Sequence, residues 1–286
     1  MINKILWIII LILAICIVFY IKSPNLQSDN NSVPIYQRDL GFFPNIKDSK
    51  RVTILCTSGL SNRIRTILGF LQVCQHKKKK LTVIWPKDGA CNGLFEDYFQ
   101  PIKGVKIKSK TKSNIHFTGQ STIEEITEHY NVNQSKSLYC NIRLIPRIQQ
   151  KINIFVNKHS LKNKVGIHVR RTDLTGTYTA RILNGGTSTD KEFYKFIQRN
   201  AKNKEFFIAT DNKLTQDKYK NKYKNTLFYT SVKESNNLRK TTLEAAIIDI
   251  YLLSYCRKIK GTINSSFSDF SRELKKARQY AFHHIN

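Results

Sequence analysis

The sequence has 286 residues and carries 48 Lys and Arg against 20 Asp and Glu, which gives a formal net charge of +28. Its 41% hydrophobic content is enough to fill a core and excludes disorder for most of the chain, while only 12 Gly and 6 Pro exclude collagen-like and low-complexity classes. The charge indicates an anionic partner, either nucleic acid, a membrane surface or the phosphates of a small ligand, unless it reflects only a general bias toward lysine.

The amino terminus contains a candidate membrane segment. Residues 5–21 are all apolar and lie between Lys4 and Lys22, and as a helix they would span roughly 26 Å. A cleaved signal peptide is the alternative, but no small-residue cleavage site follows the apolar run. We therefore expect a signal anchor over 1–22, a stem over 23–50 and a type II single-pass protein with its folded body in a Golgi- or ER-type lumen.

The first part of the body has the pattern of a βαβ unit. A β-rich run at 51–56 is followed by a glycine turn at Gly59, a helical periodicity over 62–75 and a second strand at 81–85. Two strands joined through a helix predict a parallel sheet. Lysines alternate along 105–112, which favours an edge strand protected by charge over a ligand-binding wall.

A second alternation of strands and helices follows. We expect strands at 165–169, 205–209 and 258–263, and helices at 190–200, 241–255 and 266–282. A boundary near residue 160 then separates 51–160 from 161–286. The predicted fold class is α/β with two Rossmann-like halves behind a membrane anchor.

The strongest functional pattern follows the strand at 165–169. His168 lies in that strand, and Arg170, Arg171 and Asp173 come directly after it. Ligands bind at the carboxyl ends of strands in open α/β sheets, and guanidinium groups hold diphosphate oxygens in pairs. The alternative is a salt bridge between Arg171 and Asp173 with no ligand. A third arginine, Arg63, is a further candidate for the same diphosphate.

Other polar residues fall at strand ends or helix starts. Gly59 lies between a strand and a helix, where main-chain amides favour an anion. Ser265 and Ser266 precede the last helix, where hydroxyls either cap the helix or bind phosphate. Asp249 interrupts an apolar helix, so it is either exposed at the edge of the helix or holds a ligand. Together these positions predict a nucleotide site between the two halves.

The cysteines do not predict a metal site, because no Cys or His cluster has the spacing of metal ligands. A lumenal body would permit a disulfide such as Cys91 with Cys140, although the sequence does not establish the pairing.

Four motifs follow one another in the second half: His168-Val-Arg-Arg-Thr-Asp173, Ala209-Thr-Asp211, the helix that contains Asp249, and Ser265-Ser-Phe267. In this order they resemble the motifs of the α1,6-fucosyltransferase and protein O-fucosyltransferase superfamily. The first half adds Gly59-Leu-Ser-Asn62-Arg63-Ile-Arg65, then Trp85, Cys91 and Phe95-x-Asp97-x-Phe99. The resemblance covers residues 52–274.

The resemblance implies a GT-B-like fold and metal-independent, inverting transfer of L-fucose from GDP-fucose to a glycan or glycoprotein acceptor, with no cofactor. It also implies that Arg170 grips the β-phosphate while Arg171 supports the motif, and that His168 and Asp249 contact the guanosine. By the same resemblance, Ser265 and Ser266 lie near the phosphates with Phe267 beside them. Asp211 then lies in the wall around the pocket, and Asn62 meets the donor from the opposite half.

The sequence departs from the α1,6 pattern at the catalytic base. Where that family has a lysine and a glutamate after the arginine motif, this chain has Leu174 and Tyr178. Asp173 is the first candidate for the base, with Asp190 or Glu192 behind it. The departure predicts an acceptor different from the core N-glycan.

Two alternatives remain open from the sequence. The same fold could use another GDP-sugar. A non-enzymatic, basic, membrane-tethered module for anionic lipid or nucleic acid would explain the lysines at 77–80 and 106–112, but no nucleic-acid motif accompanies them and no nucleic-acid partner is expected.

Overall fold

The computed structural model of the chain describes residues 43–171, 188–233 and 241–285. The expected anchor at 5–21 and residues 23–42 of the expected stem lie outside these described residues. Within them, none of the helices combines the length and the apolar character that crossing a bilayer requires.

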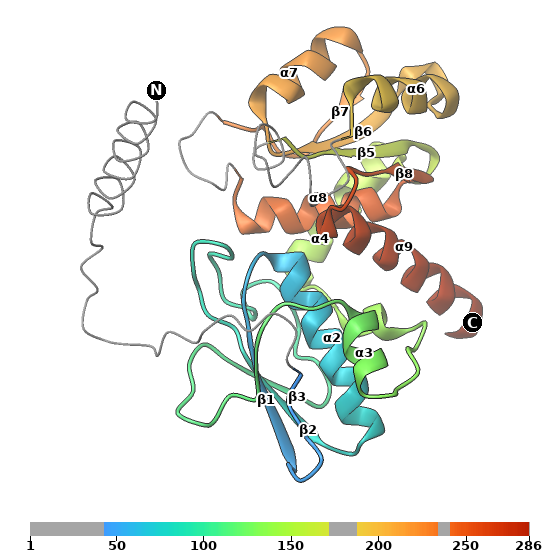
Figure 1. The fold of residues 1–286 in the computed structure, drawn as a ribbon. Helices are drawn as coiled ribbons and strands as arrows, with labels where there is room; N and C mark the ends of the chain where they lie inside the picture. The colour runs from blue at the N-terminus through green and yellow to red at the C-terminus, as the bar shows by residue number, and fades with distance from the viewer. Residues whose placement is uncertain (1–42, 172–187, 234–240, 286) are drawn as a thin grey trace, which may run out of the picture. The chain divides into compact units, whose positions relative to one another are not determined.

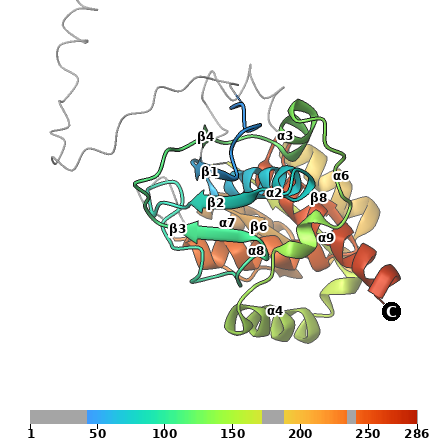
Figure 2. The same cartoon turned by 90° about the horizontal axis from the view of Figure 1, so that it is seen from below.

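The first sheet contains four parallel strands in the order β3-β2-β1-β4. The strands are β1 (Arg51–Cys56), β2 (Lys80–Ile84), β3 (Val105–Lys108) and β4 (Phe117–Gly119). Helix α2 (Leu60–His76) connects β1 to β2 and packs against both strands (Figures 1 and 2). The predicted βαβ unit is therefore confirmed.

Strand β3 lies at the edge of this sheet, as the alternating lysines predict. Lys106 and Lys108 point to solvent, and such charges discourage the pairing of an exposed edge with another chain. The strand is shorter than the predicted 105–112, because Lys108 pairs with Ile84, the last residue of β2. Beyond that point no partner strand continues the ladder.

The second sheet is also parallel and has the order β7-β6-β5-β8. Its strands are β5 (Val165–Val169), β6 (Phe206–Thr210), β7 (Thr226–Leu227) and β8 (Lys258–Lys260). Helices α6 (Asp190–Asn200) and α7 (Lys213–Lys222) cover one face, and α8 (Leu243–Tyr255) covers the other. A Cβ on Gly166 would meet Cys256 Sγ at 2.9 Å, so the glycine permits the close approach of α8 to β5.

Local sequence explains where several helices begin. Thr122 with Glu125 forms a capping box before α3 (Ile123–His129), and Thr189 with Glu192 forms another before α6. Pro146 occupies the first turn of α4 (Pro146–Lys158). The remaining helical elements are η1 (Leu138–Asn141), η2 (Leu161–Asn163), η3 (Lys202–Lys204) and α9 (Ser266–Ile285).

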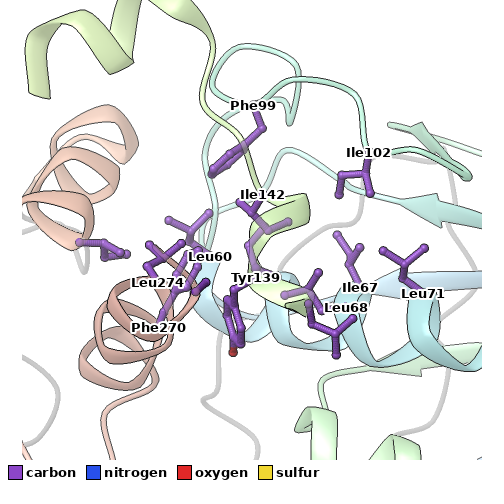
Figure 3. Close-up of a cluster of buried hydrophobic side chains, with 14 of the residues drawn as sticks. Leu60, Ile67, Leu68, Leu71, Phe99, Ile102, Tyr139, Ile142, Phe270 and Leu274 are labelled. Carbon is purple, nitrogen blue, oxygen red and sulfur yellow. The ribbon is translucent and has the colours of Figure 1, made fainter. Parts of the chain in front are cut away.

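The larger of two buried hydrophobic clusters includes residues of both sheets, and the smaller one lies between the second sheet and helices α6 and α7. Phe207 and Ala209 of β6 belong to the same buried cluster as the first sheet, and α8 and α9 supply many of its members. Figure 3 shows Phe270 and Leu274 of α9 beside Tyr139 and Leu60 from the first half. The ring centroids of Tyr139 and Phe270 are 5.7 Å apart. The α/β class with parallel sheets is confirmed, whereas the domain boundary near residue 160 stays a prediction.

Candidate functional site

The carboxyl end of β5 is where the two-arginine motif leaves the second sheet. Strand β5 pairs with β6 on one side and with β8 on the other, so its end lies between two neighbouring strands. Thr262 follows β8; its Oγ1 accepts from the Arg170 main-chain N–H at 3.0 Å and donates to the His168 carbonyl at 2.9 Å. These bonds fix the backbone at Arg170, which is half-buried, without using its guanidinium group.

His168 is buried against the start of α9. Its Nδ1 lies 2.7 Å from Ser268 Oγ, and its ring stacks on Phe267 with centroids 4.2 Å apart and an interplanar angle of 19°. The imidazole, the phenyl ring and the first turn of α9 therefore form one wall beside the motif. Ser266 is half-buried in the same turn.

Arg171 makes the contacts of a positioning residue. Its guanidinium group donates to the Ser188 carbonyl at 2.7 Å and to Asp190 Oδ1 at 2.9 Å, and its main-chain N–H donates to Asp211 Oδ1 at 2.8 Å. The ion pair is with Asp190 at the start of α6. The sequence analysis considered Asp173 as the salt-bridge partner of Arg171 or as the catalytic base. Asp173 lies outside the described residues, as do Leu174 and Tyr178.

Two other candidates for the base are poorly suited to accept a proton. Burial acts to raise the pKa of Asp190, but the hydrogen bonds and charges of Lys218 and Arg171 outweigh it, and the pKa lies below its ordinary value. The main-chain N–H of Thr189 lowers the pKa of Glu192, which is exposed in its capping box. A carboxylate stabilised in its charged form is a weak general base.

Asp249 is buried on α8, with 5% of its surface exposed. Burial raises the pKa of this carboxyl well above its ordinary value, and the nearby Thr230 side chain only partly opposes the shift. Its Oδ1 has no hydrogen-bond partner within the described part of the chain. Of the two readings that the sequence left open, exposure at the helix edge is therefore wrong, and a buried acceptor in need of a ligand fits the structure.

Two hydroxyl groups near Asp249 and α9 are also buried without a hydrogen-bond partner among the described residues. Ser265 is fully buried just before α9, and both its Oγ and the Thr230 Oγ1 make no hydrogen bond with any residue that the structure describes. A buried polar atom left unpaired costs about 1 to 3 kcal/mol. These atoms are therefore candidate contacts for a polar ligand that enters the site.

The first half contributes a separate polar cluster at the start of α2. Gly59 is the N-cap residue of α2 and has extended backbone angles. Asn62 Nδ2 donates to Ser58 Oγ at 3.1 Å and also to Gln120 Oε1, and Asn62 Oδ1 accepts from Arg65 at 2.6 Å. Within the described ranges, these contacts stay inside the first half and do not reach the residues of the second sheet.

Arg63 does not face a diphosphate, which corrects the expectation from the sequence. Its side chain is fully buried, donates through Nε to the Ser58 carbonyl at 2.8 Å and pairs with the Asp88 carboxylate. Its guanidinium group also lies over the Trp85 ring, 5.1 Å from the centroid. The positive charge is already neutralised inside the protein, so Arg63 holds the turn at the start of α2.

The structure thus brings together only part of the predicted set. His168, Phe267 and Ser268 are in contact, and Arg171 and Asp211 are joined through the backbone. Sequence reasoning assigned no individual role to Thr262, Ser268 or Thr230. Ser268 follows a recognisable helix start, whereas Thr262 and Thr230 lie in loops with no motif to mark them.

The described cysteines do not support the disulfide that the sequence permitted. Cys140 is an exposed free thiol, so the pairing with Cys91 is not formed. Among the described residues, no group of three or more His, Cys, Asp or Glu side chains is placed to hold a metal ion.

The protein family described as alpha-(1,6)-fucosyltransferase N- and catalytic domains matches residues 130–281 of this chain. The match spans more than half of the sequence and contains the arginine motif, Asp249 and the start of α9. No curated protein matches the chain.

Solved structures of NodZ, an alpha-1,6-fucosyltransferase, share the fold. The structure co-crystallized with GDP has a TM-score of 0.54 at 14% identity and covers 78% of this chain and 92% of its own. The structure soaked with GDP-fucose has a TM-score of 0.54 at 15% identity with the same coverage. NodZ from Bradyrhizobium gives a TM-score of 0.53 at 13% identity, covering 78% of this chain and 93% of its own.

The family match and the parallel α/β fold agree with the ordered motifs and with the site at the end of β5. They leave no support for the non-enzymatic basic module. This chain therefore belongs to the alpha-(1,6)-fucosyltransferase family and is a glycosyltransferase of the fucosyltransferase superfamily.

Proposed function

We propose that this protein is a membrane-anchored, inverting glycosyltransferase with a GT-B-like arrangement that transfers L-fucose from GDP-fucose to a glycan or glycoprotein acceptor. Family membership supports the reaction class. NodZ was co-crystallized with GDP and soaked with GDP-fucose, and those ligands belong to that relative. That donor becomes a proposal for this chain because its own site has matching chemistry.

The observation that carries the donor proposal is the buried, unpartnered Oδ1 of Asp249. A guanine base presents two adjacent N–H donors, which a carboxylate oxygen pair can accept. Ser265 Oγ, also buried and unpartnered, offers a hydroxyl at the start of α9, where main-chain amides favour phosphate. Asp249 and Ser265 therefore suit a guanosine diphosphate.

The residues have distinct proposed roles in holding the donor. Arg170 would bind the β-phosphate, while Arg171 keeps the motif in place through Asp190 and Asp211. His168, fixed by Ser268, would contact the guanosine. From the first half, Gly59 and Asn62 would meet the donor across the site, and Ser266 would lie near the phosphates.

In the proposed step, an acceptor hydroxyl oxygen attacks the anomeric carbon of fucose from the face opposite GDP. The new C–O bond forms while the bond from the anomeric carbon to the β-phosphate oxygen breaks, which inverts the configuration. The hydroxyl proton passes to a base, and GDP leaves with the electron pair. Arg170 stabilises the charge that grows on the leaving phosphate, and this supply of positive charge is the basis for proposing metal-independent transfer.

Asp173 remains the proposed base. Asp190 and Glu192 are held in their charged forms by Arg171 with Lys218 and by Thr189, which makes them weaker proton acceptors. Leu174 and Tyr178 replace the lysine and glutamate of the α1,6 pattern, so we propose an acceptor other than the core N-glycan. The apolar run at 5–21 supports a type II anchor that places the body in a Golgi- or ER-type lumen.

The donor proposal is tested by measuring GDP release from GDP-fucose by the full chain, alongside GDP-mannose and GDP-rhamnose, with calorimetry for GDP binding. We expect GDP to bind and GDP-fucose to turn over fastest. Faster turnover of another GDP-sugar would reassign the donor while keeping the fold. If the protein neither binds GDP nor releases it, the proposal is wrong. Product analysis with a panel of glycans and peptides then identifies the acceptor.

Replacing Asp249 with asparagine is expected to weaken GDP binding by about 10- to 100-fold, the value of a charge-assisted hydrogen bond in a buried site. Because burial raises the pKa of Asp249 well above the ordinary value of about 3.9, the carboxyl loses its proton and becomes a better acceptor only as the pH rises through that raised pKa. GDP affinity of the unsubstituted protein should therefore increase with pH in that range, and calorimetry at several pH values measures it.

The raised pKa of Asp249 also predicts that the protein without ligand becomes less stable as the pH rises. The neutral form is favoured in the folded state, so this stabilising contribution is complete at low pH and is lost as the pH rises through the folded-state pKa. The Asp249→Asn variant should lack both trends. Asp217→Asn, at an exposed carboxylate on α7, is the matched control. Equal GDP affinity in Asp249→Asn and the control would remove Asp249 from the site.

A further inference from the structure

A cavity lies away from the carboxyl end of β5. It has a volume of about 490 Å³ and is lined by residues of the η1–α4 segment, α8 and α9, among them Tyr139, Arg143, Tyr255 and Arg278. Figure 3 labels three of the lining residues, Tyr139, Ile142 and Leu274, in the cluster of buried hydrophobic side chains. The volume falls in the range of small-molecule sites.

The direction of the helices separates this cavity from the carboxyl end of β5. Helix α9 begins at Ser266 beside His168, and the cavity-lining residues Leu274 to Ala281 lie about two to four turns further along it. Tyr255 is the last residue of α8, which leads directly into the amino end of β8. The cavity is therefore at the amino edge of the second sheet, opposite the edge that carries the arginine motif.

The charged side chains that line the cavity are all basic. Arg143 and Arg278 contribute two guanidinium groups, and none of the described residues that line the cavity is acidic. The nearest acidic side chains on α9, Asp269 and Glu273, are paired with Arg272 and Lys276.

Arg278 has a buried donor that the protein does not use. Its Nη2 is buried and donates to no acceptor in the described part of the chain, while its guanidinium carbon lies 3.8 Å from the centroid of the Tyr255 ring. Burial lowers the pKa of Arg278, and the phenol groups of Tyr255 and Tyr251 partly oppose the shift. An unsatisfied buried guanidinium donor is costly, and an anion would relieve that cost.

The remaining wall is suited to an apolar body. Tyr251 donates its hydroxyl to the Ile142 carbonyl at 3.1 Å, so its ring faces the cavity with the polar atom already satisfied. Leu144, Pro146 and Leu274 add aliphatic surface. A hydrated inorganic ion would leave this surface uncovered.

We propose that this cavity binds an organic anion, a phosphate or carboxylate attached to an aromatic or aliphatic body, with Arg278 Nη2 donating to the anion. The proposal concerns a site distinct from the donor site and does not depend on the proposed reaction. Such an anion comes either from a soluble metabolite or from the headgroup of a lipid.

Calorimetry on the full chain with saturating GDP, which keeps the donor site filled, tests the site with 1-naphthyl phosphate. We expect 1-naphthyl phosphate to bind at least tenfold more tightly than either of two fragment compounds. Inorganic phosphate carries only the charge, and 1-naphthalenemethanol carries only the aromatic body. Arg278→Met should weaken binding at least tenfold, whereas Lys276→Met, an exposed cation on the same helix, should not change it. Equal binding of either fragment compound, or unchanged binding in Arg278→Met, overturns the proposal.

A second measurement needs no substitution. Cys140 is exposed and lines the cavity, whereas the other described cysteines are buried. 1-Naphthyl phosphate should slow alkylation of Cys140 by iodoacetamide at least fivefold, followed by peptide mass spectrometry, and unchanged alkylation would contradict the site. Vesicles with and without phosphatidic acid identify the source: stronger protection of Cys140 by phosphatidic acid than by 1-naphthyl phosphate assigns a lipid headgroup, and the reverse order assigns a soluble metabolite.

Discussion

The Arg170→Ala variant is expected to release GDP from GDP-fucose about 10²- to 10³-fold more slowly than the unsubstituted protein, a loss of about 3 to 4 kcal/mol of transition-state stabilisation. Charge grows on the β-phosphate as the bond to the anomeric carbon breaks, so the guanidinium group should matter more in the transition state than in the ground state. We therefore expect kcat to fall more than GDP affinity.

The variant should fold, because Thr262 holds the main chain at position 170 through the backbone N–H and because the side chain is only half-buried. Arg199→Ala on the exposed face of α6 is the matched control and should keep full turnover. Arg170→Lys keeps the charge without the paired donors and should recover only part of the rate. Turnover in Arg170→Ala equal to that of the control would refute the phosphate assignment.

Arg63→Ala is expected to lower the free energy of unfolding by about 2 to 3 kcal/mol, because a fully buried guanidinium group loses its hydrogen bonds while Asp88 keeps 38% of its side chain exposed to solvent. The change removes the partner of Asp88, leaves the Ser58 carbonyl without its donor and takes a guanidinium group from the Trp85 ring. Denaturant titration followed by circular dichroism measures the difference.

Arg51→Ala, at an exposed arginine that opens β1, removes the same charge from the same half and should stay within about 0.5 kcal/mol of the unsubstituted protein. GDP affinity gives an independent check on the role of Arg63. If Arg63→Ala kept its stability but lost GDP binding, Arg63 would be a ligand contact after all. We expect the reverse.

The sequence predicted the elements that have a strong period of their own. The strands at 51–56 and 165–169 have the bounds that were expected, because each is a short, mostly apolar run. Strands β4 and β7 were not predicted, since three and two residues are too few to show a period and their pairing depends on neighbouring strands. Local pattern alone could not reveal them.

For the candidate site, sequence order identified the motif but could not assign partners. Arg171 pairs with Asp190 rather than Asp173, and Arg63 pairs with Asp88, because the fold brings together residues that the chain separates. The burial of Asp249 also could not be predicted from the sequence. An acidic side chain in an apolar helix can face solvent or lie in the core, and the packing of the helix determines which of the two occurs.

The shared core has a consequence for how the protein unfolds. Because Phe207 of β6 and Phe270 of α9 lie in the same cluster as Ile54 of β1, a fragment cut near residue 160 would expose apolar surface that only the other half covers. The two sheets are therefore expected to melt in one cooperative transition, even though each has its own strands. Exchange of one half between relatives would therefore require matching surfaces on α8 and α9.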